Sequence, residues 1–172
     1  MTILPRDEFI DLISKNCQVD GFDELTSKIV GTLFIEPEEV ALEDLAKMTG
    51  YSLSAVSTAM KIVVRTGLVK RMKKPGSRKV YFYMEKDMIK TIMQIMQRKH
   101  ELVITKTKKE LPNIIKKYGS EKSKASKDEL QIIKAYQKQV LVFENVIGSL
   151  IQMLEGAETA DSSCRKSNSR VN

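Results

Sequence analysis

The residues that form disulfide bonds and bind metal ions are scarce in this sequence. Its 172 residues include one histidine and two cysteines, Cys17 and Cys164, and no tryptophan is present. Two cysteines so far apart do not form a disulfide framework, and one histidine cannot supply a metal cluster. We therefore expect no disulfide-stabilised fold, no bound metal and no cofactor.

Long apolar runs and enzyme motifs are also missing. No uninterrupted apolar run approaches the roughly 18 residues of a membrane-spanning helix, and the N-terminus lacks the basic-then-apolar order of a secretory signal. No nucleophile–base pair, phosphate-binding loop or metal-ligand spacing is evident. Because 42% of the residues are hydrophobic and 30% are charged, we expect a cytoplasmic protein with a substantial core, no membrane contact and no enzymatic activity.

The basic residues that are present concentrate in one stretch. Residues 61–83 contain eight lysines and arginines and no acidic residue, whereas the net charge of the whole chain is only +7. Such a concentration of one sign of charge favours a polyanionic partner such as nucleic acid.

Helical patterns precede and enter this basic stretch. We predict a helix over residues 5–16, a second that Asp23 caps and that runs to about Ile35, and a third over residues 42–48 after a short extended link at Val40-Ala41. Ser52 caps a fourth helix that runs to about Thr66. Gly50 and Gly67 are expected to end the third and fourth helices. The apolar side of the fourth helix suits packing on the preceding helices, while its other side is small at the start and cationic at the end. The residues that we expect to face DNA are Ser52, Ser54, Ser57, Thr58, Lys61 and Arg65.

A β-hairpin is predicted directly after this helix. Residues 68–72 and 79–84 have the composition of strands, and Lys74-Pro75-Gly76-Ser77 is a turn signal because proline presets φ and glycine accepts a positive φ. The hairpin tip carries basic side chains that suit the phosphates or the flanking minor groove of a duplex. These wing residues are Lys73, Lys74, Arg78 and Lys79.

The second half of the chain is predicted to be helical. One long helix begins at Asp87, with Pro112 expected to kink or divide it, and residues 119–128 form a solvated connector. A last helix over residues 129–155 places apolar residues at alternating steps of three and four, as in a coiled-coil seam. We predict that this seam joins two copies of the chain through Leu130, Ile133, Val140, Ile147, Ile151 and Leu154.

Together these patterns predict a mainly α protein with a small β-hairpin wing, a winged helix–turn–helix with dimerisation helices at both ends. We divide it into an N-terminal helical arm (1–22), a DNA-binding domain (23–86), a helical dimerisation region (87–155) and a disordered tail (156–172).

The segment from Ala41 to Glu85 resembles the winged helix–turn–helix of MarR-type transcriptional regulators, and within them the GbsR-like branch and its archaeal relatives. The shared features are the LxxLAxxTGxS entry at Leu42–Ser52, the serine-rich helix, GLVKR at Gly67–Arg71 and GSRKxYF at Gly76–Phe82. The resemblance implies a homodimer that binds double-stranded DNA at a pseudo-palindrome, usually as a repressor, with a small-molecule effector as a further partner.

Several alternatives stay open at this point. A winged helix can also serve as a protein–protein interaction module in a larger assembly, with the last helix as its docking seam. The sequence names neither the operator nor an effector. It also leaves open whether Cys17 is redox-active, because reactivity needs a lowered thiol pKa.

Overall fold

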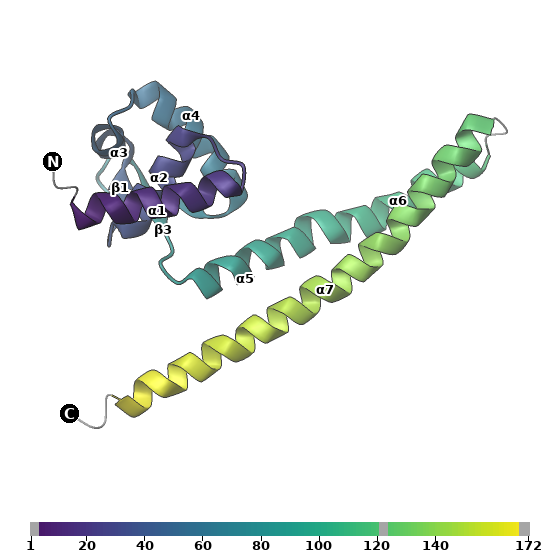
Figure 1. The fold of residues 1–172 in the computed structure, drawn as a ribbon. Coiled ribbons are helices and arrows are strands. Elements are labelled where there is room, and N and C mark those ends of the chain that lie inside the picture. Colours follow the sequence, from purple (N-terminus) through teal and green to yellow (C-terminus); the bar gives the residue numbers. More distant parts are fainter. Residues whose placement is uncertain (1–3, 121–123, 169–172) are drawn as a thin grey trace. The chain divides into compact units, whose positions relative to one another are not determined.

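The computed structural model describes residues 4–120 and 124–168, and the side chains of the last helix from 126 to 157. The chain divides into two compact units, the first ending at Thr91 and the second beginning at Ile92. Figure 1 labels most elements of both units. The fold is mainly helical with one small antiparallel sheet, as predicted for a winged helix–turn–helix.

The first unit contains four helices and the sheet. Its helices are α1 (Pro5–Val19), α2 (Glu24–Ile35), α3 (Leu42–Thr49) and α4 (Leu53–Thr66). Local signals fix their ends, as the sequence predicted. The Asp23 carboxylate accepts a 2.7 Å bond from the Thr26 N–H at the start of α2, Ser52 caps α4, and Gly50 and Gly67 end α3 and α4 with positive φ.

The sheet has one strand more than the predicted hairpin. Strands β2 (Val69–Lys73) and β3 (Val80–Met84) pair in antiparallel fashion, and β1 (Val40–Ala41) pairs with the outer side of β3 to give the order β1-β3-β2. Two residues carry no periodicity, which is why the sequence predicted only an extended link at this position.

One hydrophobic core holds the first unit together. Thirteen buried residues from α2, α3, α4 and all three strands form a single cluster. The predicted apolar side of α4 is its contribution, with Val56 and Val63 fully buried. Because α4 and the hairpin share this core, the polar side of α4 and the wing are held in fixed positions relative to each other.

Helix α1, predicted as an arm, packs along α2 within the same unit. The close approach depends on Gly31, since a Cβ atom built there would lie 2.7 Å from the backbone oxygen of Ile10 and 3.0 Å from Ser14 Oγ. A contribution of α1 to dimerisation stays a prediction.

The second unit is built from long helices. Helix α5 (Met88–Lys99) continues through a π-helical segment, η1 (His100–Thr105), into α6 (Lys106–Gly119), and α7 (Lys124–Asn168) returns alongside η1 and α6. Its core cluster consists of only Ile104, Val140 and Ile147, with Met96 and Ile151 packed against them.

Three features of this region differ from what the sequence predicted. Pro112, expected to kink or divide the helix, lies inside α6 and does not divide it, and the irregular segment is η1 instead. Helix α7 begins at Lys124, within the predicted connector. It also continues to Asn168 where a disordered tail was predicted from residue 156, because extending an existing helix costs far less than nucleating one. Residues 169–172 of that tail lie outside the described residues.

Helix α7 also bears on the prediction of no membrane contact. Between Ser126 and Ala157 it is long enough to cross a membrane, with a window of mean hydropathy 1.3. The prediction considered only uninterrupted apolar runs, which this helix lacks. Its apolar character comes from two adjacent stripes of side chains, described below.

Candidate nucleic-acid interface

The exposed side of α4 presents the predicted recognition residues. Ser54, Thr58, Lys61 and Arg65 are exposed, and Ser57 is half-buried. The Ser52 hydroxyl accepts a 3.2 Å bond from the Ala55 N–H, so its first role is to cap the helix. The Thr58 hydroxyl donates to the Ser54 carbonyl oxygen at 3.1 Å, which leaves its oxygen lone pairs facing outward as acceptors.

The wing residues lie around the turn between β2 and β3, and all four predicted lysines and arginines are exposed. Gly76 adopts φ +74°, as the turn signal requires. The Ser77 N–H bonds the Lys74 carbonyl oxygen, and the Ser77 hydroxyl accepts from the Lys79 N–H at 3.1 Å. These bonds shape the tip, so its cations project from an ordered turn.

One wing cation already has a carboxylate partner. Lys74 Nζ lies 3.2 Å from a carboxylate oxygen of Glu39, the residue before β1, and 4.7 Å from the centroid of the Tyr81 ring. A hydrogen bond from its own backbone, followed by the bond from Lys74, holds the pKa of Glu39 below its ordinary value. Lys74 is therefore less available to an incoming phosphate than its neighbours in the wing.

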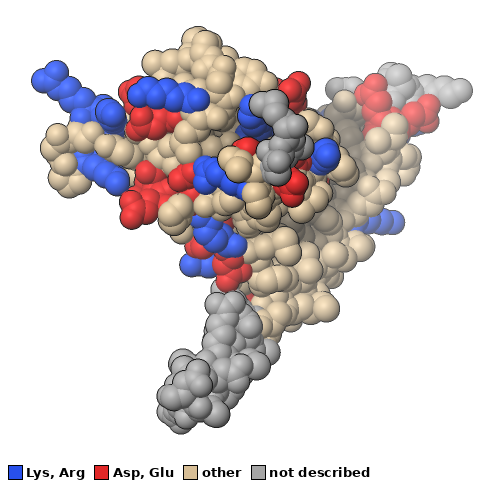
Figure 2. All heavy atoms as spheres, turned by 60° about the vertical axis from the view of Figure 1, so that its left-hand side comes forward, with Lys and Arg blue, Asp and Glu red and all other residues tan. Residues whose placement is uncertain are grey.

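The surface around the interface is mixed in charge. In Figure 2, acidic side chains lie between the lysines and arginines on the face turned forward. Residues 1–60 contain eleven acidic and four basic residues, against eight basic and no acidic residues in 61–83. A polyanion is therefore attracted to one part of the first unit and repelled by the rest.

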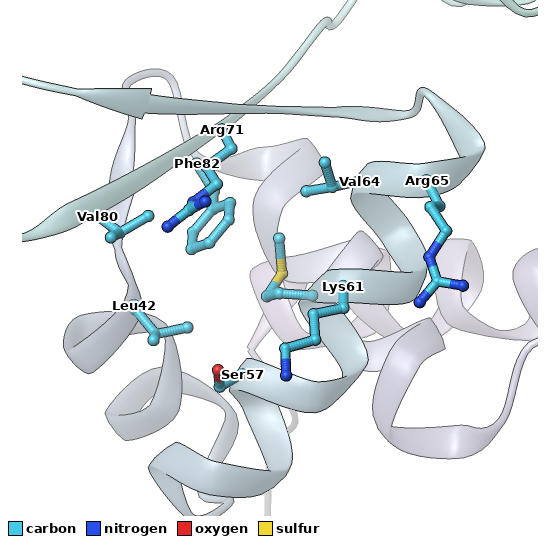
Figure 3. Close-up of a pocket in the computed structure, with 9 residues that line it drawn as sticks. Leu42, Ser57, Lys61, Val64, Arg65, Arg71, Val80 and Phe82 are labelled. Atoms are coloured by element: carbon cyan, nitrogen blue, oxygen red, sulfur yellow. The ribbon is translucent and has the colours of Figure 1, made fainter.

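A groove of about 500 Å³ lies at the surface between α4 and the sheet. Met60, Val64 and Phe82 are among its apolar lining residues, and its polar lining residues are Ser57, Lys61, Arg65 and Arg71. Figure 3 shows Arg71 reaching from its strand into the groove beside Phe82, while Arg65 points away from the strands.

Arg71 was not among the predicted site residues. It is opposite Phe82 in the β2–β3 register, and directly opposed residues lie on the same face of a sheet. Phe82 is buried, so Arg71 also faces the helix-covered side. Side chains along β2 point alternately to the two faces of the sheet. This alternation assigns Arg71 to the face that α4 covers only once the register with β3 is known.

The residues predicted to join two copies lie on the side of α7 that packs within the chain. Val140 and Ile147 are buried against Ile104, Ile151 packs on the same cluster, and Leu130, Ile133 and Leu154 are half-buried on the same side of α7. A heptad pattern does not reveal which helix covers it, and a role of these residues in joining two copies stays a prediction.

A second stripe on α7 is exposed except at the half-buried Leu150. At positions offset by one residue from the first seam, alternating steps of four and three again select mainly apolar residues. These are Ile132, Tyr136, Gln139, Phe143, Val146, Leu150 and Met153. Tyr136, Phe143 and Val146 line a groove of about 670 Å³ together with Val103, and 72% of the Met153 surface is exposed.

Cys17 lacks the lowered pKa that a reactive thiol needs. It is half-buried and packs against the core of the first unit. Burial, assisted by the negative charge of Asp20, raises the pKa of the Cys17 thiol above its ordinary value, which disfavours the thiolate that oxidants attack. Within the described residues, no group of three or more His, Cys, Asp or Glu side chains is placed to hold a metal ion.

Comparison with known proteins connects this geometry to transcription. No family model matches the sequence. A Bacillus subtilis (strain 168) protein named "Putative HTH-type transcriptional regulator YvaV" is 22% identical over 110 residues, covering 63% of this chain and 62% of that protein. The chain thus spans less than two thirds of that relative's length. The HTH-type transcriptional repressor OpcR of the same organism is 18% identical over 160 residues, covering 89% of this chain and 85% of that protein.

A solved structure shows the same fold. It is the crystal structure of a transcriptional regulator, with a TM-score of 0.65 and 15% identity, covering 89% of this chain and 99% of that one. At this identity the likeness concerns the fold alone. The similar proteins are transcriptional regulators rather than enzymes, and the chain has the mainly helical fold with a winged sheet that such regulators use.

Proposed function

We propose that this chain is a sequence-specific, double-stranded DNA-binding transcriptional regulator that acts as a homodimeric repressor. The observation that carries the proposal is the rigid placement of a polar, cationic side of α4 beside an ordered cationic wing. The named functions of the relatives support regulation, and OpcR, named a repressor, supports repression. The motifs from Leu42 to Phe82 support placing the chain with MarR-type regulators of the GbsR-like branch.

In this proposal α4 is the recognition helix and enters the major groove. Ser54, Ser57 and Thr58 approach base edges or phosphates, while Lys61 and Arg65 supply positive charge. Because serine and threonine discriminate poorly between bases, DNA shape contributes to sequence preference. Lys73, Lys74, Arg78 and Lys79 of the wing reach the flanking minor groove, whose negative potential favours such side chains.

The second stripe of α7 is the proposed dimer surface. Its alternating spacing matches a coiled-coil seam, and a second copy presents an identical stripe, as a two-fold interface requires. Lys99 Nζ lies 5.5 Å from the Phe143 ring centroid at the edge of this surface, so a charged rim borders an apolar centre, as is common in protein interfaces. The proposal accounts for exposed apolar side chains that the unit itself does not cover.

The experiment is selection of genomic fragments with the purified protein, followed by footprinting of the best fragment at two salt concentrations. We expect a protected pseudo-palindrome with half-sites about one helical turn apart. If each protomer neutralises about four phosphates, the log–log salt slope should be roughly −7. Uniform, weak binding that salt abolishes would contradict sequence-specific regulation and favour a role in protein–protein assembly.

A further inference from the structure

The groove between α4 and the sheet has the features of a site for one strand of the DNA backbone. This inference rests on the proposed function. A recognition helix in the major groove and a wing in the adjacent minor groove lie on either side of the sugar–phosphate strand that separates the two grooves of the duplex. That strand must therefore cross the surface between α4 and the hairpin, where the groove of about 500 Å³ lies.

Cationic and polar groups line this groove on both walls. Arg71 extends from β2 and Lys61 from α4, and the Ser57 hydroxyl lies on the helix side (Figure 3). A guanidinium offers paired N–H donors that match two phosphate oxygens. Lysine adds a compact positive charge, so the two side chains can approach one phosphate from opposite sides.

The two cations are available for such a contact. Within residues 4–120 and 124–168, the ion pairs of the structure include neither Arg71 nor Lys61, in contrast to Lys74, which pairs with Glu39. Met60, Val64 and Phe82 give the groove an apolar lining. Such a lining suits contact with the carbon atoms of a deoxyribose.

We propose that Arg71 is a DNA-contacting residue that, with Lys61, clamps a phosphate of the strand separating the major and minor grooves. The contact would be to the backbone alone, so it positions the protein on the duplex and carries no base preference. Arg71 thereby extends the interface beyond the exposed side of α4 and the wing tip.

Arg71→Gln tests the clamp in the full-length protein, because glutamine keeps a planar polar end while removing the charge. Each lost phosphate contact makes the log–log salt slope shallower by about 0.9, or about 1.8 for a dimer with two clamps. At 0.1 M salt we expect binding about 60-fold weaker, equally for the selected site and for unrelated duplexes, with the loss shrinking toward 1 M. Arg71→Lys should recover the slope.

Lys70→Gln is the matched control, since Lys70 precedes Arg71 on β2 and therefore points to the opposite face of the sheet. It removes the same charge and should leave the slope nearly unchanged. Equal changes in both variants would show a general charge effect and overturn the clamp. An unchanged slope in Arg71→Gln, with its melting temperature also unchanged, would overturn it as well.

Phosphate-ethylation interference locates the contact on the DNA. Ethylation of the phosphate at the border between the recognised major groove and its flanking minor groove should weaken wild-type binding and have little further effect on Arg71→Gln. A wild-type protein without any discrete footprint would instead refute the proposed function. A normal footprint with interference unaffected by Arg71→Gln would refute only the clamp.

Discussion

The two compact units of this chain differ in how completely each buries its own apolar residues. The first unit closes thirteen buried side chains into one core. The second has a core cluster of three and leaves ten large apolar side chains exposed among its described residues. A unit that completes its own core can present a polar surface to a ligand, whereas one that does not needs another surface to cover it. The difference agrees with the proposed division into a DNA-binding unit and an association unit.

The two units also differ in how their charged residues are distributed. Residues 1–91 contain fourteen basic and thirteen acidic residues, yet the basic ones cluster in 61–83. Residues 92–172 contain fifteen basic and nine acidic residues, spread along the sequence. The unit with the smaller net charge carries the more defined cationic surface, so arrangement rather than net charge identifies the interface.

The largest expected effect comes from a charge in the exposed stripe of the second unit. Val146→Glu should convert the dimer to a monomer, because each buried, unpaired carboxylate costs several kcal/mol and a two-fold interface contains two. Sedimentation velocity at micromolar concentration measures the change. Asn145→Glu, one residue away and outside the stripe, is the control and should remain dimeric. A monomeric wild-type protein would end the dimer proposal.

The reverse experiment damages only the first unit. Gly31→Ala should destabilise it by about 1–3 kcal/mol, the cost of overpacking, because the new methyl group would meet the Ile10 carbonyl at 2.7 Å. Thermal melting measures the loss, and the association state should not change. Gly148→Ala in α7 is the control: beyond its chain neighbours and the nearby backbone of its own helix, no atom lies within 4 Å of its built Cβ, so helix propensity should raise stability slightly. Equal melting shifts in both variants would disprove tight packing of α1 on α2.

A smaller effect concerns the contrast of charges within the first unit. Glu39→Gln frees Lys74 from the partner that lies 3.2 Å away and removes a negative charge beside the wing. We expect DNA affinity to increase about two- to five-fold, the size of a surface ion pair, with a steeper salt slope. Quantitative binding at three salt concentrations checks this. A weaker affinity would show that the pair serves to hold the wing in position.

The smallest effect is expected at an ion pair of the second unit. Glu144 accepts bonds of 2.6 and 2.9 Å from Lys108 Nζ, and this bond, followed by the nearby charges of Lys108 and His100, lowers the pKa of the Glu144 carboxyl. A lowered folded-state pKa means that the stabilisation is present at neutral pH and is lost as the pH falls through that pKa. Wild type and Glu144→Gln should therefore differ slightly in melting temperature at pH 7 and converge in acid. A constant difference at every pH would exclude the ion pair as its cause.

Local signals predicted much of the first unit. The caps at Asp23 and Ser52, the glycines that end α3 and α4, and the turn at Gly76 act over a few residues, and the structure confirms them. The prediction of which side of α4 is buried and which is exposed was also right, because apolar residues of a core-facing helix recur with the helical period. The two-residue β1 was missed, since its strand character comes only from pairing with β3.

The sequence by itself determined the caps, the turn, the amphipathic sides of the helices and the concentration of basic residues, because each depends on neighbours along the chain. Only the tertiary structure decided that Arg71 lines the groove beside α4, that Glu39 forms an ion pair with Lys74, and which of two adjacent stripes on α7 is covered within the chain. Those outcomes depend on residues distant in sequence, and a pattern along one helix or strand contains no information about the surface that will pack against it.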